Sequence, residues 1–522
     1  MPRIAIVYIR AIKVLSKKST CTAIRRIRGP PNSSFFLGHE WLLRSHWHVG
    51  DLEMEWYKQY GAAYRIGGCF GQDILTVADP KALQYIFHSS GYRFPKTKDF
   101  ERFGDMLLGQ GLAIVGGQIH QCQRRILGPA FAASRLQLFL NVFQASATKL
   151  MEKIGHRVGD VKVINMLEWT SKAALNIIGI TSFRYHFNSL DDRENELMTA
   201  VYNVFGESQL WPTTLELLYP ALWHVFPDWL LKPLEWIPNR EVKRTGQFRK
   251  VASKIARTIF EKQLNEVAND INPAEKDIVN VLAISHLTED AKKRMSDIEV
   301  DSQLATFIVA GHDTTANTMA WLLYELSHHP EDQAKIHKEI AQTKAKALGV
   351  LTSNDYDSMP WLNASIKEAL RLHPLAYSLF RMAGQDDVLP LAEPVITSDG
   401  KLCSEIPVSK GQVVAASVYT YNRLPSVWGS DADKWNPPRF FEDRTTKQAY
   451  LGVYANLLTF SGGIRGCIGW RFAVMELQSV VTELLDNFEF SIPKGMPDLQ
   501  HGPANFVLTP IIPPMKGLRF HC

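Results

Sequence analysis

A short run near the C-terminus, Phe460–Gly469, constrains this chain more than any other feature, because four of its ten residues are glycine and Cys467 lies among them. Glycine lets a backbone bend sharply and come close to a flat partner. Successive backbone amides of such a loop can point at the sulfur and stabilise a thiolate. A helix beginning at about Gly469 directs its positive N-terminal end toward the same charge. The run therefore predicts an uncrowded, ionised cysteine.

The residues around this cysteine indicate what a thiolate there would bind. A single thiolate suits haem iron better than zinc, which usually takes four protein ligands. Phe460 can pack behind the sulfur and exclude water, and Arg465 places a cation where it suits a carboxylate at the edge of a bound ring. The other five cysteines are scattered without a Cys-x-x-Cys pair, which argues against a disulfide framework. The alternative is a glycine-rich turn with an inert cysteine.

Apolar periodicity predicts a mainly α protein with a small β component. Helical spacing of apolar residues is found at 134–154, 240–268, 300–328, 359–372 and about 470–486. Alternating stretches within 62–77 predict a hairpin, and strands return between 377 and 420. No linker or repeat divides the rest of the chain. We therefore assign 29–522 to one large domain and 1–28 to a basic N-terminal tail or interfacial segment.

The charge balance limits the class of partner. A net charge of +5, from 58 basic and 53 acidic residues, is too small to indicate nucleic acid. It permits a local basic face for an acidic protein partner or for lipid headgroups.

The cysteine run resembles the haem-binding signature of the cytochromes P450, Phe-x-x-Gly-x-Arg-x-Cys-x-Gly. The matching residues are Phe460, Gly463, Arg465, Cys467 and Gly469. The resemblance extends from about residue 29 to the C-terminus. It implies the fold of that family, a single large helical domain, of the eukaryotic, fungal type. It also implies haem b (iron protoporphyrin IX) with the Cys467 thiolate as axial ligand, and Gly463 and Gly469 beside the cofactor.

The segment Ala310–Thr315 places an acid and hydroxyls in the middle of the apolar helix 300–328, where polar groups are costly without a purpose. Thr314 can donate a hydrogen bond to bound dioxygen, and Asp313 can relay protons from solvent. Gly311 would let a flat ligand approach the backbone. The alternative is a kinked helix whose threonines bond to its own carbonyls. Resemblance to the family's Ala-Gly-x-Asp-Thr-Thr motif favours the catalytic roles.

Glu368 and Arg371 stand three residues apart, on one face of the helix 359–372. As an exposed pair they would contribute little to stability. The resemblance implies instead a buried pair that a second arginine, Arg439, joins from a later loop to hold the cysteine loop in place. Pro438 replaces the glutamate that more usually precedes this arginine in the family.

The resemblance also implies a set of residues that neutralises the two propionates of haem. In the segment 120–125, His120 replaces the family's usual tryptophan and shares a helix face with Arg124. The complete expected set is His120, Arg124, Arg381 and Arg465. A surface role is the alternative for His120 and Arg381.

The reaction implied by the resemblance is insertion of one oxygen atom from O2 into an apolar small molecule, of the kind met in secondary metabolism. Electrons would come from NADPH–cytochrome P450 reductase, with cytochrome b5 as a further donor, because the chain contains no recognisable flavin or nicotinamide domain. Three alternatives stay open: a peroxide-driven or isomerising enzyme of the same fold, a non-catalytic haem protein, and a helical binding protein without haem.

Two segments bear on membrane association. Residues 4–15 are apolar but interrupted by Arg10 and Lys13, and are shorter than the ~20 residues that span a bilayer. The segment 210–237 is rich in tryptophan, leucine and proline, as in a lid that covers a substrate channel and dips into a membrane. A core layer of short helices is the alternative. We expect the cytosolic face of the endoplasmic reticulum membrane.

Overall fold

The structure of the chain is a computed structural model that describes residues 23–512 except 47, 160–162, 192–195, 205–211, 227–230, 232–239, 270–276, 289, 291–293, 348, 442–449 and 505–506. Most of the predicted tail, and much of the predicted lid at 210–237, lie outside the described residues.

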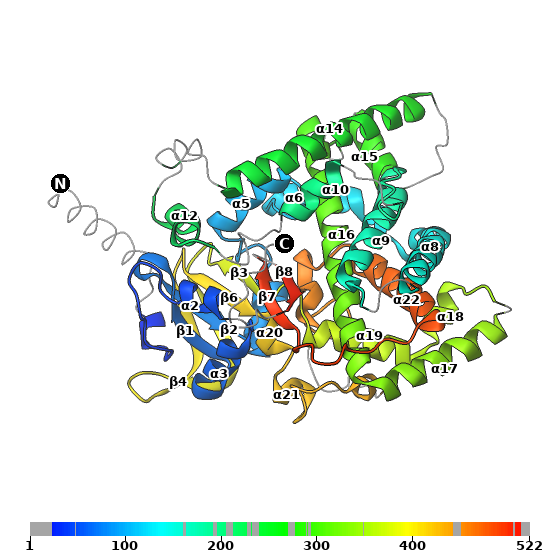
Figure 1. Cartoon of the computed structure of the whole chain (residues 1–522). Coiled ribbons are helices and arrows are strands. Elements are labelled where there is room, and N and C mark those ends of the chain that lie inside the picture. The colour runs from blue at the N-terminus through cyan, green and yellow to red at the C-terminus, as the bar shows by residue number, and fades with distance from the viewer. Residues whose placement is uncertain are drawn as a thin grey trace.

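Helices make up most of the described chain, as predicted (Figure 1). The long ones are α8 (Leu140–Val158), α9 (Met166–Phe183), α14 (Arg240–Ala268), α16 (Asp297–His328), α17 (Pro330–Lys346), α19 (Pro360–Leu372) and α22 (Trp470–Asn487). The short ones are α2 (Glu40–Ser45), α3 (Asp51–Tyr60), α4 (Pro80–Gln84), α5 (Lys98–Leu108), α6 (Gly117–Leu127), α7 (Ala133–Leu136), α10 (Glu196–Val204), α12 (Thr214–Val225), α15 (Ile278–Leu287), α18 (Ser353–Asp357), α20 (Val418–Tyr421) and α21 (Pro425–Trp428).

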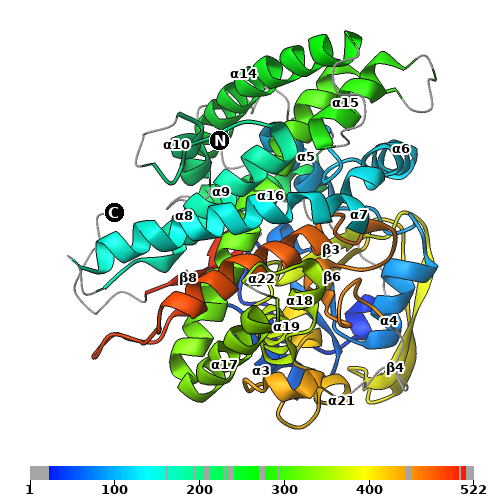
Figure 2. The same cartoon turned by 90° about the vertical axis from the view of Figure 1, so that its right-hand side faces the viewer.

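The helix α16 runs through the middle of the molecule (Figures 1 and 2). A capping box starts it: the Ser296 hydroxyl accepts from the Glu299 amide, and the Glu299 carboxylate accepts from the Ser296 amide. Most of its residues on either side of Ala310–Thr314 are buried, and the helix packs against α9, α14, α19 and α22.

The β component is small, as predicted. The strands are β1 (Ala63–Gly67), β2 (Asp73–Val77), β3 (Ser378–Met382), β4 (Asp387–Ile396), β5 (Leu402–Val408), β6 (Val413–Ser417), β7 (Gln500–Ala504) and β8 (Val507–Ile511). Four of them form a sheet in the order β1-β2-β6-β3, in which only the β2–β6 pair is parallel. The pairs β4–β5 and β7–β8 are separate antiparallel hairpins. The predicted hairpin within 62–77 is the β1–β2 pair.

One predicted helix is broken. The segment 134–154 contains α7, a 3-10 turn at Gln137–Phe139, and only then α8. Leu136, Leu140 and Phe143 are buried on both sides of the turn, whereas Leu138 within it is largely exposed. One face therefore stays on the core across the 3-10 turn, and apolar spacing alone does not show such a break.

The start of the described chain is packed against the folded body rather than free. Ile24 and Ile27 are buried in the main core, and the Arg28 carbonyl accepts from the Arg65 amide. Residues 24–28, which the sequence assigns to the tail, are thus part of the folded unit.

Among the described residues, no single helix is both long and apolar enough to cross a membrane. One bent pair, Gly117–Phe131 with Ala133–Val158, reaches that length and composition together, with a 47° bend.

Candidate active site

The cysteine loop approaches the rest of the chain so closely that only glycine fits at two of its positions. A Cβ on Gly463 would lie 1.8 Å from the carbonyl oxygen of Phe87, and one on Gly462 would lie 2.2 Å from that of Leu451. Gly463 also has a φ of +61°, which disfavours other residues. Both glycines therefore serve packing against neighbouring backbone. The predicted position of Gly463 beside a cofactor is not what requires glycine there.

Cys467 lies where its sulfur can be stabilised as a thiolate. The Gly469 amide donates toward the sulfur, and α22 begins at the next residue, Trp470. The Phe460 carbonyl accepts from the Cys467 amide at 2.8 Å and fixes the turn. Burial raises the pKa of the Cys467 thiol, while the Gly469 amide and the charge of Arg124 act in the opposite direction. Solvent nevertheless reaches the residue, so protein surrounds the sulfur without covering it.

Arg124 braces the same loop. Its guanidinium donates to the Gly466 carbonyl at 2.7 Å, one residue before Cys467. This contact holds Arg124 against the backbone of the cysteine loop, in addition to its predicted role as a partner of a carboxylate.

Arg381 and Arg465, both expected to meet a carboxylate, are neighbours that face none. Arg381 in β3 is 6% exposed, donates to the Phe380 carbonyl and stacks 5.3 Å above the Phe87 ring. The Nε of Arg465 is buried without a partner, although its Nη1 donates to the Val115 carbonyl at 3.1 Å. Burial, with repulsion from Arg465, lowers the pKa of Arg381 to about 9. An anion between Arg381 and Arg465 would reduce their repulsion and offset the cost of burying positive charge.

Lys96 adds a further cation to this pair, and His120 lies beside it. Burial and then repulsion from Arg465 and Arg381 hold the pKa of Lys96 well below its usual value. Burial, with repulsion from Arg465, Lys96 and Arg124, lowers the pKa of His120 to about 4, so this imidazole is neutral near pH 7. In the described part of the chain, no carboxylate is within 4.0 Å of the charged nitrogens of Lys96, Arg124, Arg381 and Arg465.

These cations, defined as the cationic cluster Lys96, Arg124, Arg381 and Arg465, fit the anionic edge of a bound ring. A buried unpaired charge costs several kcal/mol, and two carboxylates would offset that cost. The sequence did not indicate Lys96, which no motif marks. His120 also differs in detail, because its Nδ1 lies 2.7 Å from the Tyr92 hydroxyl. The site therefore suits a flat group with two carboxylates and a metal that accepts a single thiolate.

On α16 the residues of the predicted oxygen-activation segment are accessible where the helix is otherwise buried. Ala310 is exposed, and Asp313 and Thr314 are half-buried. Burial raises the pKa of Asp313 to about 6, against the opposing hydrogen bond from Asn317. The Thr314 hydroxyl donates to the Ala310 carbonyl at 2.6 Å, which is the arrangement of the non-catalytic alternative. Its oxygen can still accept a hydrogen bond, and rotation would free its proton.

Packing already requires glycine at position 311. A Cβ at this position would lie 2.6 Å from the Cδ1 of Ile178 on α9. Glycine is therefore needed there for the close packing of α9 on α16, and the predicted approach of a ligand to its backbone stays a prediction.

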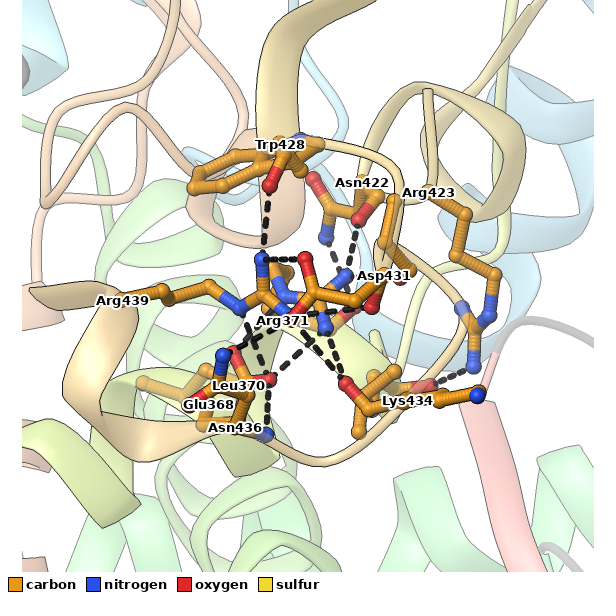
Figure 3. A network of polar contacts seen from close by, with 12 residues as sticks. Glu368, Leu370, Arg371, Asn422, Arg423, Trp428, Asp431, Lys434, Asn436 and Arg439 are labelled. Atoms are coloured by element: carbon orange, nitrogen blue, oxygen red, sulfur yellow. Dashed lines mark hydrogen bonds and ion pairs between the residues drawn. The ribbon is translucent and has the colours of Figure 1, made fainter. Parts of the chain in front are cut away.

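Glu368, Arg371 and Arg439 meet in a buried network (Figure 3). Arg371 binds the Glu368 carboxylate with two hydrogen bonds of 2.7 and 2.8 Å, and Arg439 donates to it at 3.0 Å. All three side chains are at most 3% exposed. Asp431, which the sequence did not indicate, pairs with Arg439 at 3.0 Å. The network satisfies every charge that it buries, as a buried ion pair requires.

This network reaches the cysteine loop through Asn422. Arg371 donates to the Asn422 carbonyl at 2.8 Å, and the Asn422 side chain accepts from the Leu458 amide at 3.2 Å and donates to the Thr459 hydroxyl at 2.9 Å. Thr459 in turn donates to the Leu370 carbonyl at 2.7 Å. The segment that leads into Phe460 is thereby tied to α19.

Comparison with known proteins decides the family. The sequence profile of the family described as Cytochrome P450 matches residues 28–515. The chain belongs to the cytochrome P450 family. The chain is 31% identical over 493 residues to cytochrome P450 monooxygenase 81 of Postia placenta, covering 92% of this chain and 89% of that protein. It is 30% identical over 476 residues to cytochrome P450 monooxygenase claQ of Ampulloclitocybe clavipes, covering 90% and 86%.

Membership of the cytochrome P450 family confirms the predicted fold class and enzyme class, a monooxygenase. It implies haem with a cysteine thiolate ligand, a redox partner, dioxygen and an organic substrate. Cys467 and the cationic cluster are the residues of this cytochrome P450 whose chemistry would fit haem.

Proposed function

We propose that this cytochrome P450 inserts one oxygen atom from O2 into an apolar small molecule, using electrons from an external NADPH-dependent reductase. Cys467 would supply the thiolate that holds haem, and the cationic cluster would bind its propionates. The observation that carries the proposal is that Arg381 is buried and that Arg465 has a buried, unpartnered Nε. Among the described residues neither guanidinium has a carboxylate within 4.0 Å, and Arg465 belongs to the loop of an accessible cysteine.

Haem bound here would supply the redox chemistry that activates dioxygen, and a thiolate ligand favours O–O cleavage. The chain supplies position, charge and protons. The Gly469 amide and the start of α22 stabilise the negative charge of the Cys467 sulfur. The Glu368 network holds the loop at one distance from α19 and so fixes the sulfur.

Proton delivery falls to Asp313 and Thr314. A carboxyl with a pKa of about 6 exchanges protons readily near neutral pH, as a relay requires. The Thr314 hydroxyl, one residue further along the accessible part of α16, can pass such a proton on once its hydrogen bond to Ala310 is released.

The substrate is proposed to be moderately large and apolar, such as a terpenoid, a fatty acid or an aromatic metabolite. The supporting features are the accessible Ala310 and the apolar residues Phe307 and Val309 near it on α16. The segment 100–117, which begins within α5, and the segment 376–379 are the other proposed walls. We also propose association with the cytosolic face of the endoplasmic reticulum membrane.

The test is spectral and chemical. The purified, haem-loaded chain is reduced under carbon monoxide, and the band typical of thiolate-ligated haem is expected. Substrate oxidation should then require the nicotinamide cofactor, a reductase and O2 together. A missing band would refute Cys467 ligation, whereas turnover with peroxide alone would favour the peroxide-driven alternative. Addition of cytochrome b5 tests that further electron donor.

A further inference from the structure

Three histidines and one glutamate outside this site form a continuous hydrogen-bonded chain. The Nε2 of His48 lies 3.0 Å from the Nδ1 of His501, whose Nε2 lies 2.7 Å from the Nδ1 of His373. The Nε2 of His373 lies 2.7 Å from Oε1 of Glu325. The four residues come from the turn before α3, from β7, from the end of α19 and from α16, so the chain joins four separate parts of the fold.

Only one end of this histidine chain is open to water. His373 and His501 are 5% and 2% exposed, whereas the side chain of His48 is 30% exposed. Trp321 covers the buried part, because its ring stacks on that of His373 at 4.2 Å and lies 4.5 Å from that of His501. A proton can therefore reach His373 from solvent most directly through the other two histidines.

The glutamate sets the direction of the hydrogen bonds. Burial raises the pKa of Glu325, but His373 and neighbouring histidines outweigh burial and hold this pKa below its usual value. The Glu325 carboxylate is therefore ionised and can only accept hydrogen bonds. The Nε2 of His373 must then donate, and its Nδ1 accepts from the Nε2 of His501. By the same argument His501 accepts from the Nε2 of His48. All three imidazoles are neutral, and a bare Nδ1 remains on His48.

We propose that this chain is a proton-binding site that takes up one proton at His48 and stores it on buried His373. The proton binds Nδ1 of His48, the Nε2 proton of His48 passes to Nδ1 of His501, and the Nε2 proton of His501 passes to Nδ1 of His373. Three N–H bonds form and two break, so one proton is gained. His373 becomes an imidazolium that still donates to Glu325.

The geometry limits uptake to one proton. After the first proton every hydrogen bond is kept, with the two histidine–histidine bonds reversed in direction. A second proton would place two N–H donors face to face, which breaks one link. Burial and the charge of Arg423 lower the pKa values of His48, His373 and His501, and repulsion within the chain lowers those of His48 and His501 further. The remaining groups that face the chain are Asp51 and Glu325, which favour the proton, and His46, His328, His329, Arg371 and Tyr419.

The consequence concerns the C-terminal hairpin β7–β8. His501 holds it through its ring and through its carbonyl, which accepts from the Val49 amide at 3.3 Å. Leu508 donates to the Leu375 carbonyl at 2.8 Å, a few residues before β3, which carries Arg381. The hairpin thus stays docked through the first protonation, whereas the second breaks one of the ring contacts that hold it.

The test is nitrogen NMR of the full, haem-loaded protein with labelled histidines, titrated downward from pH 8. We expect His48 and His501 to change from the Nε2–H to the Nδ1–H tautomer in the same transition in which His373 gains its charge. Independent transitions of the three residues, or protonation of His373 without a tautomer change in the other two, would overturn the proposal.

Two variants separate a relay from simple packing. Glu325→Gln removes the anion while keeping the shape, and should weaken proton binding at least about tenfold, moving the shared transition down by a pH unit or more. His48→Gln can still donate to His501 but carries no transferable proton, so His501 and His373 should no longer change in that pH range. His337→Gln, on the exposed face of α17, is the matched control and should change neither. An unshifted transition in Glu325→Gln, or an unchanged His373 in His48→Gln, contradicts the proposal.

Discussion

The Asn422 side chain donates to the Thr459 hydroxyl at 2.9 Å, and this bond joins the buried Glu368 network to the cysteine loop. Asn422 is fully buried, and its other contacts are with Arg371 and Leu458. A polar network that is fully satisfied specifies one arrangement of its members. The distance between α19 and the cysteine loop is therefore set by hydrogen bonds rather than by apolar packing alone.

Thr459→Val should disturb this link without a change of shape. The substitution removes the Thr459 donor from the Leu370 carbonyl and leaves the Asn422 amide with the Arg371 carbonyl alone, so we expect a loss of about 1–3 kcal/mol in the free energy of unfolding. Chemical denaturation measures it. Thr343→Val removes a hydroxyl that bonds within α17, and a similar loss there would show that the effect is not specific to the link.

Glu368→Gln should be more severe, because it leaves Arg371 and Arg439 buried with less compensating charge. Breaking such a pair costs about 3–5 kcal/mol, and we expect haem to be lost during purification. The haem-to-protein ratio and thermal unfolding report both effects. Lys401→Gln removes an exposed partner of Asp399 and should be nearly silent. A Glu368→Gln protein as stable as that control would contradict the structural role.

Cys467→Ser tests the proposed ligand directly. The hydroxyl fits the same space, so circular dichroism should show a retained fold. The reduced carbon-monoxide band of thiolate haem and the monooxygenase turnover should both disappear. Retained turnover would remove Cys467 from the mechanism.

Arg381→Met should have opposite effects in the haem-free and haem-loaded states. Without haem, the substitution removes a buried cation that repels Arg465 and Lys96, so the apoprotein should melt at a higher temperature. With haem, one propionate partner is lost, so transfer of haem to an acceptor protein should be faster. Arg294→Met, at an exposed position, is the control for charge alone. Destabilisation of the apoprotein would contradict the idea that this cation lacks a partner.

Asp313→Asn should change both turnover and the pH dependence of stability. The folded pKa of about 6 lies above the usual value of about 3.9. Between these values the folded state binds more protons, so the native enzyme gains stability as pH falls from 6 to 4, and the variant lacks this gain. The variant should therefore be the more stable protein at pH 7, with less advantage at pH 4.

Turnover of the Asp313→Asn variant should fall about 10²–10⁴-fold with a larger solvent isotope effect. Asp433→Asn, an exposed change, is the control for both readouts.

Much of the fold could be predicted because it depends on local patterns. The helix predicted at 240–268 matches α14, and those at 359–372 and 470–486 match α19 and α22 within a residue at each end. The apolar spacing of these helices is a property of short segments. The turn that divides 134–154 was missed because the apolar face continues across it.

Of the candidate site, the sequence alone determined the cysteine run and the pairing of charges within one helix, since both are encoded by neighbouring residues. Only the tertiary structure decided which cations share one buried region, that Ile178 fills the space beside Gly311, and that Asn422 connects the Glu368 network to Thr459. The tertiary structure also brings His48, His501 and His373 into one hydrogen-bonded chain that ends at Glu325. These contacts join residues far apart in the chain. Their contribution to stability depends on burial and on the distance between the groups, which a local sequence pattern does not determine.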